Sequence, residues 1–254
     1  MRTRSLSESE YAAVCLRREL SISVNEAIYF PYVFQRLNIR FRKADLPNNI
    51  LGASKVEGLN RLIVVSSRKK YATKERFTTA HELGHVALRH GYSQCKFNDI
   101  YGQKTRADRE NEANAFASAF LLPPSIVATW AQAGNVTINA AGKLGKQYDI
   151  SLTSALISLV KNSPFSFCVF FQSKDAIDYS ISSPSCLGRA RKGPVMPGSG
   201  IKAVGTECHQ HNSVCDYTAW FYEKPGMDYN CSEETIYLPN YQKAISIVQV
   251  WEKD

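Results

Sequence analysis

A five-residue segment of the chain has the residue types and the spacing of a metal-dependent hydrolytic site. Residues 81–85 read His-Glu-Leu-Gly-His. On a helix, residues four apart lie on the same face one turn apart, so His81 and His85 can offer two imidazole nitrogens to one zinc ion. Glu82 can then accept a proton from a water that the metal activates. The same segment also fits an amphipathic helix with two histidines on its packed side.

The sequence around this motif predicts a strand followed by a helix. Residues 61–67 are short and rich in β-branched side chains, which is typical of a buried strand. Thr78 or Thr79 can cap the helix that follows, and Gly91 is a typical residue at a helix end. Residues 46–56 are expected to form a loop. The motif is therefore expected on a helix that comes directly after a strand.

A catalytic zinc site needs a third protein ligand and leaves its fourth position to water. The next carboxylates on a predicted helix lie in residues 107–122, which a proline pair ends. Glu110 and Asn114 share an alanine-rich face of this helix, where burying them requires partners. We expect Glu110 to be the third ligand and Asn114 to hydrogen-bond a ligand. Glu112 lies about 200° around the helix and is expected in solvent. No cysteine lies at helical spacing beside these ligands, which favours an open site.

These two motifs together resemble one known family. The segments RFTTAHELGHVALRHG and ENEANAFASAFLLPPS are similar to those of the ImmA/IrrE metallopeptidases, and the similarity runs over roughly residues 50–125. The resemblance implies one Zn²⁺ per chain, with His81, His85 and Glu110 as ligands and Glu82 as general base. It also implies an α+β fold with a zincin-like, gluzincin-type catalytic domain, in which a small sheet packs on the metal-binding helix.

Two interpretations of function remain open. The resemblance implies a zinc-dependent endopeptidase that makes limited cuts in a cytoplasmic protein, in particular a helix-turn-helix transcriptional repressor. Cleavage would relieve repression in a mobile-element, toxin–antitoxin or stress response. An extended substrate would pair with the strand at residues 61–67 if that strand is an edge. The alternative is a metal-stabilised, non-proteolytic binding module or transcription regulator that sequesters a repressor.

The chain is predicted to have three parts. Residues 1–125 form the zincin-like domain, residues 126–161 a helical segment that resembles a helix-turn-helix, and residues 162–254 a β-rich region for sensing or substrate selection. Further helices are predicted at 6–20, 25–37, 125–133, 137–149 and 151–160, and further strands at 39–41, 165–171, 216–222, 235–238 and 245–251. The helical segment has few basic residues, so a packing role is favoured over direct DNA binding.

Other side chains are candidates for secondary roles. A group of cysteines and histidines in the last part of the chain is a candidate second metal site: Cys186, Cys208, His209, His211, Cys215 and Cys231. The alternative is that the cysteines are free buried thiols. The stabiliser of a developing oxyanion has three candidates near the motifs: Tyr92, Tyr101 and Arg109. His90 is expected to end the helix rather than to bind the metal.

Charge is unevenly distributed along the chain. Residues 1–80 carry 15 Lys and Arg against 7 Asp and Glu, whereas residues 81–254 carry 16 of each kind. The basic excess fits attraction to an acidic substrate or to nucleic acid, or a solvated basic surface. The first residues do not resemble a signal peptide, no apolar run approaches the ~20 residues of a membrane span, and the 7 cysteines are an odd number. We therefore expect reduced thiols, a cytoplasmic location and no membrane partner.

Overall fold

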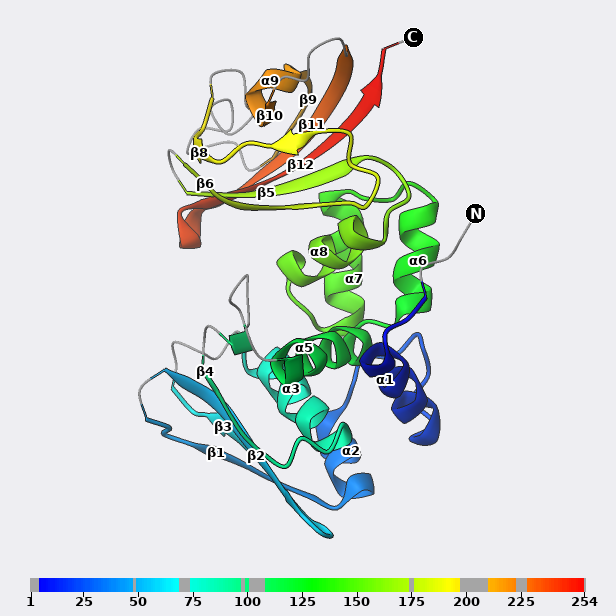
Figure 1. Cartoon of the computed structure of the whole chain (residues 1–254), viewed down its shortest axis with the longest axis vertical. Coiled ribbons are helices and arrows are strands. Elements are labelled where there is room, and N and C mark those ends of the chain that lie inside the picture. Colours follow the sequence, from blue (N-terminus) through cyan, green and yellow to red (C-terminus); the bar gives the residue numbers. More distant parts are fainter. Residues whose placement is uncertain are drawn as a thin grey trace. The chain divides into compact units, whose positions relative to one another are not determined.

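The structure is a computed structural model that describes residues 5–47, 49–68, 74–96, 99–100, 108–173, 176–196, 210–222 and 228–253. The chain divides into two compact units (Figure 1). Unit 1 comprises Met1–Ile126 with Lys146–Ile150, and unit 2 comprises Val127–Gly145 with Ser151–Asp254. Each unit contains helices and a sheet, so the predicted α+β class is confirmed.

Unit 1 contains a four-stranded sheet with the strand order β1, β3, β2, β4. Its strands are β1 (Ile39–Ala44), β2 (Ile50–Glu57), β3 (Asn60–Ser66) and β4 (Tyr92–Lys96). β3 runs parallel to β1, and β2 pairs antiparallel with both β3 and β4. The predicted strand at residues 61–67 is thus an interior strand, so the condition on which it could pair with a substrate, an edge position, is not met. β4 is the edge strand at the other end of the described sheet.

Two strands of this sheet were not expected from the sequence. Residues 46–56 were expected to be a loop, but most of them belong to β2, which has partners on both sides. Gly52, Ala53 and Ser54 are small and only weakly β-forming, so pairing with two neighbours decides the conformation here. β4 follows directly on Gly91, whose φ of 80° is a conformation that glycine adopts readily.

Unit 1 contains the helices α1 (Glu8–Glu19), α2 (Phe30–Leu37), α3 (Glu75–Ala87) and α5 (Asp108–Leu121) in the described residues. α3 packs against α5 and against β2 and β3, and α1 packs against α5. At the contact of α3 with α5, a Cβ built on Gly84 would lie 3.2 Å from Cα of Ala113. This glycine lets the two helices that carry the metal motifs approach closely.

The buried face of α1 is not formed by its larger apolar residues alone. Tyr11 and Cys15 are exposed, whereas Ser9, Ala13 and Arg17 are buried. The Arg17 guanidinium donates hydrogen bonds to backbone carbonyls of Phe120 at 2.7 Å, Ser23 at 2.5 Å and Glu26 at 2.7 Å. These charge-assisted hydrogen bonds offset the cost of burying the cation.

The helices α2 and α3 are present as predicted, but they begin at other residues than expected. α2 begins at Phe30, with Pro31 in its first turn, so the predicted helical residues 25–29 lie outside it. α3 begins at Glu75, so Thr78 and Thr79 are buried inside the helix rather than capping it. The Thr79 hydroxyl instead donates to the Glu75 carbonyl at 2.8 Å.

Unit 2 contains α8 (Leu152–Asn162), most of α6 (Pro124–Gln132) and α7 (Ile138–Tyr148), and an antiparallel sheet. The sheet has the order β8, β6, β5, β12, β11, β9 in the described residues. Its strands are β5 (Phe167–Ser173), β6 (Ala176–Ser182), β8 (Gly193–Pro194), β9 (Gln210–Cys215), β11 (Tyr229–Leu238) and β12 (Lys243–Glu252). α8 packs on β5 and β6, and an aromatic cluster around Trp220 packs against β5, β11 and β12.

Several predicted elements of this region are present, and one is wrong. α7 and α8 are joined at Asp149, which has a φ of 52°, so the predicted pair of helices with a tight turn is confirmed. Residues 216–222 were expected to form a strand, but Tyr217–Trp220 is a helical turn, α9. The Asp216 carboxylate accepts a hydrogen bond from the backbone N–H of Thr218 at 2.8 Å and so caps that turn. Two short strands, β7 (Arg189–Ala190) and β10 (Phe221–Tyr222), pair separately.

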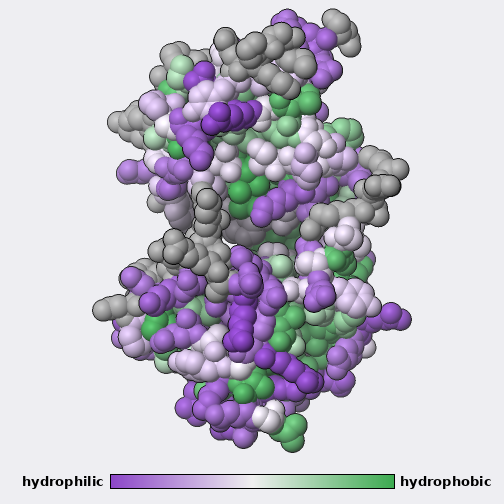
Figure 2. All heavy atoms as spheres, in the orientation of Figure 1, coloured by the Kyte–Doolittle hydropathy of each residue, from purple (hydrophilic) through white to green (hydrophobic). Residues whose placement is uncertain are grey.

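Figure 2 shows a surface of mixed polarity, on which hydrophilic and hydrophobic residues are interspersed over each unit. Among the described residues, none of the helices combines the length and the apolarity that a membrane crossing demands.

Candidate metal centre

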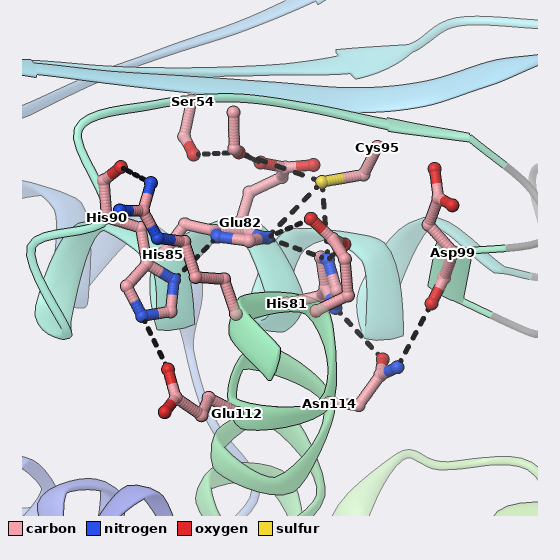
Figure 3. A network of polar contacts seen from close by, with 12 residues as sticks. Ser54, His81, Glu82, His85, His90, Cys95, Asp99, Glu112 and Asn114 are labelled. Atoms are coloured by element: carbon pink, nitrogen blue, oxygen red, sulfur yellow. Dashed lines mark hydrogen bonds and ion pairs between the residues drawn. The ribbon is translucent and has the colours of Figure 1, made fainter. Parts of the chain in front are cut away.

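Helices α3 and α5 and strand β4 bring four potential metal ligands together (Figure 3). His81, His85, Cys95 and Glu110 each contribute one ligand atom, and these atoms all lie within 4.8 Å of one another. Three of the four are the residues that the sequence analysis selected. The fourth, Cys95, was not expected, because strand β4 was not predicted and helical spacing cannot reveal a residue that reaches in from a sheet.

The distances between the ligand atoms fit a single metal ion. The Nε2 atoms of His81 and His85 are 3.1 Å apart. Glu110 places Oε2 at 3.1 Å from the first and Oε1 at 3.5 Å from the second. A tetrahedral ion with metal–nitrogen distances of about 2.0 Å would separate two such ligands by roughly 3.3 Å. Both histidines are fully buried, and a cation between them would satisfy their nitrogens and the carboxylate at once.

A hydrogen bond fixes the orientation of the first histidine. Nδ1–H of His81 donates to Oδ1 of Asn114 at 2.9 Å, and Nδ2 of Asn114 donates to the carbonyl of Asp99 at 3.2 Å. With its proton on Nδ1, the neutral ring presents the lone pair of Nε2 to the cluster. Asn114 therefore lies where the sequence analysis expected it, in contact with a candidate ligand.

The second histidine is oriented by a residue whose role the sequence analysis missed. Nδ1 of His85 lies 2.9 Å from Nδ1 of His90, and Nε2 of His90 lies 3.0 Å from Oε2 of Glu112. His90 follows α3, and its chain turns back at Arg89, which has a φ of 58°. Glu112 is half-exposed, as its helical position predicted, but it also pairs with His90. The sequence signal for this contact was only the proximity of a third histidine to the motif.

Glu82 is held against the sheet beside the four ligands. Its side chain is fully buried, and Oε2 accepts a hydrogen bond from the Ser93 hydroxyl at 3.1 Å. Ser93 in turn lies 2.9 Å from Ser54. Oε1 is buried and has no hydrogen-bond partner among the described residues. A Cβ built on Gly52 would lie 2.5 Å from this atom, so β2 can pass over Glu82 only because residue 52 is glycine.

Comparison with known proteins identifies the family. Residues 34–159 match the model of the IrrE N-terminal-like domain, a family of peptidases. The chain contains an IrrE N-terminal-like domain. The match includes both helices that carry the candidate ligands and all four strands of the sheet in unit 1.

Two individual proteins are similar to parts of this chain. The radiation response metalloprotease IrrE of Deinococcus radiodurans is 29% identical over 107 residues, which are 41% of this chain and 32% of that protein. The similarity therefore spans about a third of that protein's length. A solved structure described as a Mycobacterium tuberculosis transcriptional regulator has a TM-score of 0.56 and 15% identity, covering 96% of this chain and 88% of that chain. At that identity the likeness is one of fold.

Burial shifts the pKa of the carboxyl and thiol groups in the IrrE-like site. Burial raises the pKa of Glu82 to about 7, although the charge of His85 and hydrogen bonds to the carboxylate oppose the shift. Burial also raises the pKa of Glu110, but contacts with His81 and His85 outweigh it and hold that pKa well below its usual range. Burial and the two nearby carboxylates raise the pKa of the Cys95 thiol. The pKa values of the two carboxyl groups, Glu82 and Glu110, are thus shifted in opposite directions.

The candidates for an oxyanion stabiliser do not reach the four ligands in the described residues. Tyr92 is exposed on β4, and Arg109 donates to the backbone carbonyl of His90 at 3.4 Å. Tyr101 lies outside the described residues. No described residue is therefore assigned to stabilise an oxyanion in the IrrE-like domain.

The suggested second metal site involves residues of unit 2. Cys215 and Cys231 face each other on β9 and β11, with Sγ atoms 2.7 Å apart. Cys208 and His209 lie outside the described residues, and so does the side chain of His211. In the described part of the chain, the cluster at His81 is the one group of three or more metal-binding side chains.

Part of the basic excess in residues 1–80 is paired. Lys43 lies 2.6 Å from Glu75, and Arg68 lies 2.5 Å from Asp45. Arg76 is largely buried and donates to the backbone carbonyl of Ile28 at 2.7 Å. Lys69 and Lys70 lie outside the described residues. A structural role therefore accounts for some of these charges.

Proposed function

We propose that this chain is a zinc-dependent endopeptidase with a gluzincin-type active site. The observation that carries the proposal is a buried carboxylate, Glu82, beside two histidine nitrogens and a carboxylate that converge on one point. His81, His85 and Glu110 would hold the Zn²⁺, and Asn114 would orient the first of them. The IrrE N-terminal-like domain and the curated metalloprotease relative support this reaction class.

Each group of the site has a distinct chemical task. A bound zinc ion supplies Lewis acidity, which polarises a peptide carbonyl and lowers the pKa of water toward about 7. Glu82 would accept a proton at Oε1, the atom without a partner among the described residues, and pass it to the leaving amine. Ser93 holds Oε2 by its hydrogen bond. The carboxylate can therefore present one oxygen in a fixed direction.

The edge strand β4 is the proposed binding element for an extended substrate. It carries two residues of the site, Ser93 and Cys95, and pairs with β2 on one side. A substrate strand added at its other side would gain main-chain hydrogen bonds and lie along the metal centre. β4 thus replaces the interior strand β3 in this role.

The proposed substrate is a helix-turn-helix transcriptional repressor in the cytoplasm, cut at one or a few positions. The ImmA/IrrE resemblance supplies this substrate class. The radiation response in the name of the curated relative supports a stress role. Cleavage would relieve repression, and exposed basic residues such as Arg40 and Arg42 would favour encounter with an acidic surface at low ionic strength.

One observation favours a second candidate function. The four ligands His81, His85, Cys95 and Glu110 resemble the closed set of a structural zinc site, which leaves no position for water. In that case the chain would bind a repressor without cutting it, as a metal-stabilised sequestering module.

The decisive experiment is a comparison of wild type with Glu82→Gln. The variant is expected to keep its zinc, measured by elemental analysis, and to lose turnover on the target, identified by mass spectrometry of proteins cut in cells. Glu57→Gln is the matched control, because Glu57 is exposed on β2 away from the cluster. Cleavage that continues in Glu82→Gln would contradict the assigned base, and an intact repressor in a stable, chelator-sensitive complex would favour sequestration.

A further inference from the structure

A cysteine of the sheet lies at the corner of the metal cluster that a catalytic zinc leaves to water. Cys95 belongs to the edge strand β4, in which exposed and buried residues alternate. Ser93 and Cys95 are buried, while Tyr92 and Gln94 are exposed. The pleat of the strand therefore turns the thiol toward α3, the helix with both histidines.

The position of the sulfur is that of a ligand. Sγ of Cys95 lies 3.3 Å from Nε2 of His81 and 3.3 Å from Nε2 of His85. Nε2 of His81 can only accept a hydrogen bond, because the ring proton lies on Nδ1, so the one proton of the thiol can serve that contact. The contact with His85 would then need an N–H donor on its Nε2 and the sulfur as a weak acceptor. A tetrahedral zinc ion, with Zn–N of about 2.0 Å and Zn–S of about 2.3 Å, would place sulfur roughly 3.5 Å from each nitrogen.

Packing alone is a weaker explanation of this residue. Cys95 does contact a small apolar group, Leu51 with Ile100 and Phe77, and buried cysteines often act as small hydrophobic residues. Its sulfur, however, is directed at two imidazole nitrogens rather than into that group (Figure 3). A purely apolar role would not require a metal-binding atom equidistant from both histidines.

We propose that Cys95 is a fourth, displaceable ligand that closes the metal centre in the resting protein. This inference rests on the proposed zinc peptidase function and adds its regulation. Thiolate sulfur is a strong ligand for zinc, and a bound thiol loses its proton. While Cys95 occupies the fourth position, the chain can bind a substrate but cannot hydrolyse it. Loss of this one ligand converts the closed centre into an open catalytic one.

The surroundings of Glu82 fit a protein whose metal centre is closed at rest and open during catalysis. Its Oε1 is buried and finds no hydrogen-bond partner in the described part of the chain. Leaving a buried carboxylate oxygen without a donor costs free energy, and such atoms occur where a protein keeps a group ready for chemistry. Ser93 links the two residues, since its hydroxyl lies 3.1 Å from Glu82 and 3.7 Å from Sγ of Cys95.

Cobalt substitution tests the ligand set without relying on activity. The full-length protein is loaded with Co²⁺ in place of zinc, and its near-ultraviolet spectrum is recorded. Wild type is expected to show a thiolate-to-cobalt charge-transfer band that Cys95→Ala lacks. Cys95→Ser is the second variant in case alanine impairs folding. Cys15→Ser is the matched control, because Cys15 is an exposed residue of α1 in the same unit, and it should keep the band.

Two further measurements separate closure from simple binding. Zinc affinity, measured by chelator competition, should fall in Cys95→Ala by more than the roughly 10–100-fold typical of residues that only contact a ligand. Turnover of the zinc-loaded variant on its repressor substrate should exceed that of wild type. A wild-type spectrum without the band would overturn the ligand assignment, and equal or lower turnover in the variant would overturn closure. A band lost in Cys95→Ala with no turnover in any form would support the four-ligand centre while refuting the peptidase.

Discussion

On the proposed function, Gly52→Ala is expected to abolish peptide cleavage while the metal stays bound. The added Cβ would lie 2.5 Å from Oε1, 2.8 Å from Cγ and 3.0 Å from Cδ of Glu82. Ordinary contacts between carbon atoms are about 3.5 Å, so the Glu82 side chain must move by roughly 0.5–1 Å. A misplacement of about 1 Å in a catalytic group can cost about 100-fold in rate. The three atoms nearest to this Cβ all belong to Glu82, and none belongs to the candidate ligands His81, His85 and Glu110 on α3 and α5.

The effect on stability is expected to be smaller than the effect on rate. Overpacking a buried site costs about 1–3 kcal/mol, and replacing a strand glycine by alanine returns about 0.5–1 kcal/mol. The net loss in the free energy of unfolding should therefore lie between about 0 and 2.5 kcal/mol, which leaves the protein folded.

The assay compares steady-state turnover, zinc content and thermal unfolding of Gly52→Ala with those of wild type. Gly142→Ala is the matched control, because Gly142 lies in helix α7 and its Cβ would meet no described atom within 4 Å outside the adjacent helix backbone. That control should keep full turnover and be slightly more stable, by up to about 1 kcal/mol. Full turnover in Gly52→Ala would refute the assignment of Glu82 as the base that β2 positions. Loss of zinc would show that the glycine acts on the ligands instead.

Three further changes test the surroundings of the site. Asn114→Ala should lower zinc affinity by about 10–100-fold in chelator competition, because His81 loses its hydrogen-bond acceptor. Asn114→Asp keeps an acceptor oxygen and should retain most of the affinity. Gly84→Ala should lower the free energy of unfolding by about 1–2 kcal/mol in chemical denaturation, because its Cβ forces α3 away from α5; an unchanged value would contradict the close approach. Arg17→Met should cost at least about 3 kcal/mol in the same assay, because it removes three charge-assisted hydrogen bonds to carbonyls. A loss below about 1 kcal/mol in the free energy of unfolding would show that these hydrogen bonds of Arg17 add little to the stability of unit 1.

The helical half of the site could be predicted because helix geometry is local. Residues four apart on one helix share a face, so His81 and His85 meet without knowledge of the rest of the fold. The same reasoning selected Glu110 and Asn114 on a second helix, since both are polar on a face that is otherwise alanine-rich. The structure gathers these side chains at contact distance. Where the two helices start was predicted less well, because caps depend on one or two residues.

The sheet half of the site could not be predicted in the same way. Cys95 and Ser93 reach the cluster from β4, and Gly52 borders it from β2, yet neither segment has a strong hydrophobic pattern in its sequence. Their positions follow from pairing between segments that lie about 40 residues apart in the chain. β-propensity depends on such partners rather than on the strand itself. An open fourth position was therefore expected only because the residue that can fill it lies outside the helices.

The division between helices and sheet suggests how binding and chemistry could be connected in this site. In the proposed site the helices supply three ligands and the base, and the two helices approach closely at Gly84. Strand β4 supplies the sulfur that we propose as the closing ligand, and its other edge is where we propose that a substrate pairs. Both proposals act on the same 5 residues, Tyr92–Lys96. Because neighbouring strands share hydrogen bonds along their whole length, a peptide that pairs with β4 would act directly on the backbone that holds Cys95 near the histidines. Substrate pairing and release of the thiolate would then be linked through one short strand, and closure would be weakest when a substrate is in place.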